Sequence, residues 1–120
     1  RAVSEKETSM ISTLQIIAAI GTILVGLYAL IAPKKIDGFT GIKAIGRRGI
    51  SEVRSIFGGT FIGMGAAPFI LGNQAYATLG VVYLAIAAVR AVSVVVDKSR
   101  AQSNLISLAV EIVFGVLFLL

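Results

Sequence analysis

Four long apolar segments, separated by short polar stretches, occupy most of this 120-residue chain. No charged residue lies between Thr8 and Pro33, or between Ser55 and Val89. About 20 apolar residues are enough for a helix to cross the hydrocarbon core of a bilayer. The second stretch is far longer than one crossing, and its "GNQ" at 72–74 is typical of a tight turn between two helices. The pattern therefore predicts transmembrane helices at about 10–32, 50–71, 75–97 and 104–120.

These spacings predict an all-α fold, a bundle of four transmembrane helices in an integral membrane protein. We expect a polar N-terminal tail over 1–9, a single transmembrane domain over 10–120 and a basic loop over 33–49. The chain starts at Arg1 and stops on the apolar Leu120 without the interfacial residues that usually end a membrane helix. We therefore expect the natural protein to extend beyond both ends.

Every predicted helix carries a stripe of small or polar residues at helical spacing, which a surface facing lipid does not need. Small residues let helices approach closely, and polar ones bond across the interface. We therefore expect a compact bundle with one shared interior. The glycines expected to pack helices together are Gly26, Gly59, Gly63 and Gly115.

Ionisable residues inside the predicted spans are the strongest candidates for a site, because a charge at that depth is costly unless it is paired. Arg90 and Glu111 lie at matched depths on consecutive helices, so we expect them to form an ion pair. Glu52 or Ser93 should complete the donors of Arg90, and Tyr83 should line the same polar pocket. The cluster is interpreted either as a structural clamp that fixes helix register or as a ligand site.

Basic residues outnumber acidic ones, giving a net charge of +5, and most of them flank the apolar segments. Such placement favours anionic lipid head groups over nucleic acid as the partner. The residues expected to contact head groups are Lys34, Lys35, Arg47, Arg48 and Arg54. Basic residues concentrate in the loop 33–49 and after Asp97, which predicts that these loops face the cytoplasm and that both termini face outward.

The residue types that are missing exclude several kinds of chemistry. The chain has no His, Cys or Trp, so it lacks the usual zinc, haem and iron–sulfur ligands and any His-dependent nucleophile system. It also lacks the phosphate-binding pattern G-x-x-x-x-G-K-[ST]. We therefore expect no catalytic residue, no metal and no cofactor, and a protein that is not an enzyme.

Four sequence features are similar to those of a known family. They are "GLYALIAPKKI" at the end of the first helix, "SEVRSIFGGTFIGMG" at the start of the second, "VRAVSVVVD" at the end of the third, and a single Glu in the fourth. Together the chain resembles a family of small bacterial four-helix membrane proteins known only as a domain of unknown function. The resemblance implies the fold and a place in the bacterial cytoplasmic (inner) membrane, and it implies no activity.

Two functional hypotheses follow. In the first, the chain is a non-catalytic accessory or structural subunit that packs against other membrane protein subunits or against itself. In the second, it binds or carries a lipophilic ligand with an anionic or quinone-like head group, using the Arg and Glu cluster. An enzyme acting on lipid would have only Glu, Tyr and Ser available, and a small exporter would usually carry a Glu in its first helix, where the nearest polar residue is Gln15.

Overall fold

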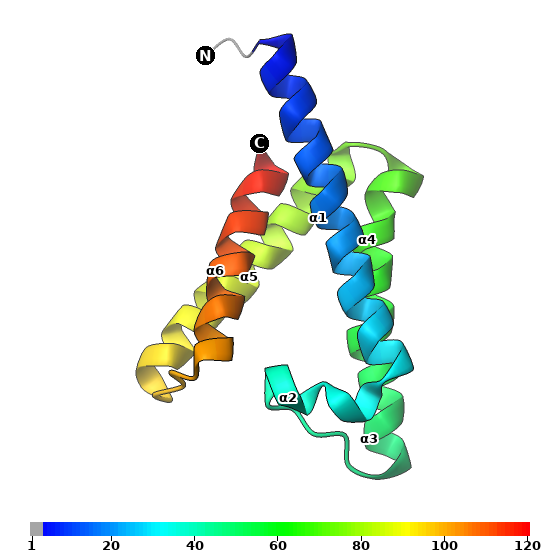
Figure 1. Cartoon of the computed structure of the whole chain (residues 1–120), viewed down its shortest axis with the longest axis vertical. Helices are drawn as coiled ribbons and strands as arrows, with labels where there is room; N and C mark the ends of the chain where they lie inside the picture. The colour runs from blue at the N-terminus through cyan, green and yellow to red at the C-terminus, as the bar shows by residue number, and fades with distance from the viewer. Residues whose placement is uncertain (1–3) are drawn as a thin grey trace.

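The computed structural model describes residues 4–120, and these form helices connected by short loops (Figure 1). Four segments are long and apolar enough to cross a membrane, as predicted. The elements in chain order are α1 (Glu5–Ile31), the 3-10 turn η1 (Pro33–Lys35), α2 (Asp37–Thr40), α3 (Gly46–Glu52), the π-helical segment η2 (Val53–Gly59), α4 (Thr60–Leu71), α5 (Gln74–Val96) and α6 (Gln102–Leu119). Because α3, η2 and α4 follow one another without a break, they form a single continuous helix.

The first helix starts earlier than the apolar pattern suggests. Ser4 is its N-cap and accepts a hydrogen bond from the backbone N–H of Glu7, while Glu5 and Glu7 lie in the first turn, where negative charge is favourable. Capping thus extends the helix through most of the segment that we expected to be a polar tail. Residues 1–3 of that tail lie outside the described part of the chain.

The helices form two antiparallel hairpins arranged as a V. One hairpin consists of α1 and the continuous helix ending in α4, and the other consists of α5 and α6 (Figure 1). The hairpins meet near the α4–α5 turn and separate toward the two basic loops, where α2 lies in the opening and approaches α6. The expectation of one interior shared along the whole bundle is therefore wrong, because close packing between the hairpins is confined to one end.

Glycines bring the two helices of each hairpin into close contact. A Cβ added to Gly26 would lie 2.7 Å from the backbone oxygen of Gly58, and one added to Gly65 would lie 2.7 Å from the backbone oxygen of Ala19. In the second hairpin, a Cβ on Gly115 would lie 2.5 Å from the side chain of Leu84. The predicted packing roles of Gly26 and Gly115 are thus confirmed.

The glycines of the second membrane-crossing helix face differently from the prediction. Gly59 and Gly63 are exposed, and a Cβ added to either would meet no atom of residues 4–120 within 4 Å. The buried positions of this helix are instead Val53, Gly58, Gly65 and Pro68. A π-helix turns once in more than four residues, so η2 shifts the inward face relative to a 3.6-residue pattern, and the expected packing role of Gly59 and Gly63 inside the bundle is wrong.

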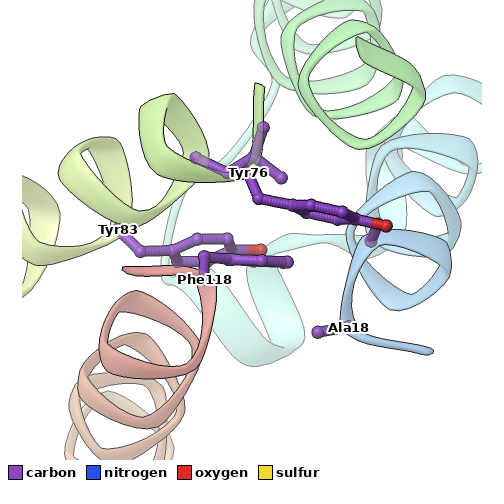
Figure 2. Packing of buried hydrophobic residues seen from close by; sticks show 6 residues of the cluster. Ala18, Tyr76, Tyr83 and Phe118 are labelled. Carbon is purple, nitrogen blue, oxygen red and sulfur yellow. The ribbon is translucent and has the colours of Figure 1, made fainter. Parts of the chain in front are cut away.

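An aromatic cluster fills the place where the hairpins meet (Figure 2). Tyr76 and Tyr83 of α5 each stack on Phe118 of α6, with ring centroids 5.7 and 5.8 Å apart. Ala18 of α1 covers the cluster from the other hairpin. The spacing of seven between the two tyrosines puts both on one face of α5, which is the face turned toward α1.

A smaller apolar cluster anchors the basic loop to the first hairpin. Ile36 is almost fully buried, with 1% of its surface exposed, and it packs with Ala29 and Val53. Phe39 of α2 contacts the ring of Tyr28, with centroids 5.7 Å apart. The loop is therefore held against the membrane end of the hairpin by its own apolar residues.

Candidate functional site: an intramembrane arginine cluster

Arg90 and Glu111 form a bidentate ion pair between α5 and α6, as predicted. The Nε of Arg90 donates to Oε1 of Glu111 at 2.7 Å, and Nη2 donates to Oε2 at 2.6 Å. The Glu111 side chain is 10% exposed and that of Arg90 is 29% exposed. Paired, fork-like geometry of this kind is the strongest form of arginine–carboxylate interaction. It explains how two charges are accommodated inside a segment able to cross a membrane.

Asn104, near the start of α6, completes the cluster. Its Oδ1 accepts a hydrogen bond of 2.7 Å from Nη1 of Arg90, and its amide donates to the backbone oxygen of Ser99 at 2.8 Å. Asn104 therefore couples the buried ion pair to the α5–α6 loop. This role was not predicted from the sequence, although Asn104 lies seven residues before Glu111 and hence on the same face of the helix.

Two residues expected to support Arg90 have other partners. Ser93 donates to the carboxylate of Asp97 at 2.8 Å, one turn along the same helix. Glu52 pairs with Arg48 at 3.0 Å, and both side chains are well exposed. The expectation that Glu52 or Ser93 completes the donors of Arg90 is therefore wrong. Each residue has a partner four positions away on its own helix. Such a pair forms whatever the distance to the neighbouring helix.

Tyr83 links the two hairpins. Its hydroxyl lies 2.6 Å from the hydroxyl of Thr22, which also donates to the backbone oxygen of Ala18. Thr22 is fully buried in α1. Tyr83 is thus satisfied by α1 where the hairpins meet, two helical turns from Arg90 on the same face of α5.

A pocket of about 500 Å³ opens beside the ion pair. Its lining is mostly apolar, with Arg90, Ser93 and Asn104 as the polar residues; the apolar ones are Ala85, Ile86 and Val89. Arg90 shares its face of α5 with Tyr83, which contacts α1, so the cluster lies on the side of the second hairpin turned toward the first. Tyr83 and Glu111, both expected to line this pocket, are not among its lining residues.

The remaining hydrogen-bonding capacity of Arg90 defines what this pocket could hold. A guanidinium has five N–H groups, and three of them are used by Glu111 and Asn104. The other two N–H groups have no partner among residues 4–120. The positive charge of Arg90 is already balanced by Glu111. Such an arrangement suits a hydrogen-bond acceptor attached to an apolar body more than a free anion.

Of the five residues expected to contact head groups, two line a second pocket, of about 390 Å³. These are Arg47 and Arg54, which share it with Ile50, Ser51 and Ser55. Arg48 is instead engaged by Glu52. Lys34 and Lys35 are exposed in η1, at the same end of the molecule.

Four helices long and apolar enough to cross a membrane, with a paired charge among them and both basic loops at one end, are compatible with a multi-pass membrane protein. A family model described as Domain of unknown function (DUF4345) matches residues 10–120, and the chain belongs to this family. The resemblance to a family known only as a domain of unknown function is thereby confirmed. No curated protein and no solved structure matches the chain.

Proposed function

We propose that this protein is a small, non-catalytic membrane subunit that packs against a helix of another membrane protein or of a second copy. The observation that carries the proposal is the outward-facing Gly59 and Gly63 in a segment long enough to cross a membrane. Glycines four residues apart permit close approach of a partner helix in lipid. Among residues 4–120, no atom lies within 4 Å of a Cβ added to either glycine, so their small surface is available to an outside partner.

Native electrophoresis of the protein, extracted from its own membranes in mild detergent, tests this proposal. The wild-type chain of 12.5 kDa should migrate in a larger assembly, and Gly63→Leu should release it as a free chain. Ala88→Leu is the control, because it places the same leucine side chain at an exposed position of α5. A wild-type protein that migrates alone, or equal behaviour of the two variants, would refute the subunit hypothesis.

Orientation belongs to the same proposal. We infer that the protein lies in the bacterial cytoplasmic membrane with both basic loops on the cytoplasmic side and both termini outside, following the positive-inside tendency. The chain has no cysteine of its own, so single cysteines can be introduced at Lys43 and Gln74. The two positions should label from opposite sides of the membrane, and labelling of both from one side would contradict this topology.

A second candidate function is the binding or carriage of a lipophilic ligand, and the pocket beside Arg90 favours it. Its volume and its mostly apolar lining with a few polar groups are typical of small-molecule sites. The ligand would be a lipid or a quinone-like molecule whose carbonyl accepts from the free N–H groups of Arg90. Mass spectrometry of molecules that copurify with the protein tests this idea.

The pocket can be filled without touching the ion pair. Val89 lines it and is 71% exposed, whereas Val81 lies on the same helix, is 60% exposed and does not line it. Val89→Trp should remove a copurifying ligand and Val81→Trp should retain it. Absence of a stoichiometric lipophilic molecule from the wild-type protein, or its retention by Val89→Trp, would argue against a ligand at this position.

A further inference from the structure

Arg47 and Arg54 converge on one groove at the basic end of the molecule. The groove measures about 390 Å³ and is lined by both arginines, by Ser51 and Ser55, and by Ile50. No acidic residue is among the described residues that line it. The arrangement combines two guanidinium groups and two hydroxyl groups on one stretch of helix, and these are donors suited to the oxygens of a phosphate.

Arg54 is held in place by the neighbouring helix. Its Nε donates to the backbone oxygen of Leu30, at the end of α1, at 3.1 Å. This bond fixes the side chain while its two terminal nitrogens remain available to another acceptor. The side chain of Arg47 forms neither an ion pair nor a hydrogen bond within residues 4–120, and Glu52 is paired with Arg48. The groove therefore has one anchored and one uncommitted arginine.

The length of the helix places this groove at the membrane surface. The continuous helix Gly46–Leu71 has 26 residues, or about 39 Å at 1.5 Å per residue. The hydrocarbon core is about 30 Å thick, so the first turns of this helix extend beyond it. Arg47 then lies among the head groups, and Arg54, about 10 Å deeper, reaches back toward them along its apolar stem.

We propose that this groove is a specific binding site for the phosphodiester head group of an anionic phospholipid. The two guanidinium groups hold the phosphate from its outer and inner sides, and Ser51 and Ser55 donate to its remaining oxygens or to the glycerol. Ile50 and the apolar surface below it accept the start of the acyl chains. This site is distinct from the pocket at Arg90 and from the outward-facing glycines, and it does not depend on either proposed function.

Native mass spectrometry of the full chain in detergent, titrated with phosphatidylglycerol, tests the proposal. The wild-type protein should retain one phosphatidylglycerol at least about tenfold more tightly than phosphatidylcholine, which has no net charge. Arg47→Gln with Arg54→Gln should weaken that binding about tenfold or more. The matched control is Lys34→Gln with Lys35→Gln, which removes the same charge from the same end outside the groove and should change binding less than about threefold.

One further variant and two possible outcomes of the titration test the proposal more sharply. In the double variant, loss of the Arg54 bond to Leu30 could disturb the fold by itself. Arg47→Gln alone breaks no side-chain bond within residues 4–120, so weaker lipid binding by this variant reports on the groove. Equal loss in the arginine and lysine pairs would overturn the proposal in favour of a diffuse attraction to the basic surface. Full displacement of the lipid by millimolar inorganic phosphate would also overturn it, because the groove would then bind the free anion.

Discussion

Breaking the Arg90–Glu111 pair should destabilise the protein more than any other single polar substitution. Arg90→Ala removes both hydrogen bonds that the Glu111 carboxylate accepts. That carboxylate is 10% exposed, so water compensates little of the loss. Removing one partner of a buried ion pair typically costs about 3–5 kcal/mol, and we expect Arg90→Ala to fall in this range.

Glu111→Ala should have a smaller effect than Arg90→Ala. Arg90 then keeps its bond to Asn104 and is 29% exposed, so its charge can find other partners. Asn104→Ala removes the hydrogen bond to Arg90 and the bond to Ser99 and should cost about 1–2 kcal/mol, since one bond between membrane helices contributes about 1 kcal/mol or less. The expected order of destabilisation is therefore Arg90→Ala, then Glu111→Ala, then Asn104→Ala.

Reversible unfolding in mixed micelles with increasing SDS measures these free energies. Near-ultraviolet circular dichroism of the stacked rings of Tyr76, Tyr83 and Phe118 reports tertiary packing, because helical content alone persists in SDS. The double variant Arg90→Ala with Glu111→Ala should lose less than the sum of the two single losses, since neither charge is then left unpaired. Exchanging the two residues, Arg90→Glu with Glu111→Arg, should recover part of the loss. Strictly additive losses, or an Ala variant as stable as the wild type, would refute the clamp.

Four further substitutions test the packing. Gly65→Ala puts a methyl group against the backbone of α1 and should separate the first hairpin, whereas Gly63→Ala, which meets nothing within 4 Å, should be as stable as the wild type in the same SDS titration. Tyr83→Phe removes the bond to Thr22 and should cost about 1 kcal/mol; a loss above 3 kcal/mol would show that more than this bond is affected. Phe118→Ala empties a site that is 2% exposed and should cost about 3–5 kcal/mol, with loss of the near-ultraviolet signal, and a signal left intact would refute the assigned stacking.

The inward faces of α5 and α6 could be predicted from the sequence because each helix follows a regular 3.6-residue period. Tyr76, Tyr83 and Arg90 recur every seven residues on α5, and Glu111 and Gly115 lie one turn apart on α6. A regular helix carries this phase from end to end. Matched depth then identified the partner of Arg90 without any knowledge of the packing.

The second membrane-crossing helix shows where such reasoning fails. Val53 and Gly58 are buried five residues apart, a spacing produced by the π-helical segment between them. Gly58 and Gly59 are adjacent in the sequence. A constant helical period predicts that Gly59 faces inward, whereas Gly58 does. The sequence around these glycines contains no pattern that predicts a π-helical turn.

The separation of the hairpins could not be predicted from periodicity either. A stripe of small or polar residues shows which side of a helix faces inward, and it carries no information about how far away the neighbouring helix lies. Glu52 illustrates the consequence. Its position on the polar stripe predicts a contact in the bundle interior, but in the structure it pairs with Arg48, one turn away on the same helix. The burial of Ile36 could not be predicted for a related reason. In a sequence, an apolar loop residue that packs against a helix looks the same as one that enters lipid.

The division into two hairpins gives each half closing contacts of its own. Gly26, Gly58 and Gly65 bring α1 against η2 and α4, and these contacts involve no residue of α5 or α6. The second hairpin is closed by its own ion pair and by the contact of Gly115 with Leu84. The hydrogen bond between Thr22 and Tyr83 joins the two hairpins, so its geometry depends on both halves, whereas the closing contacts of each hairpin depend on that half alone.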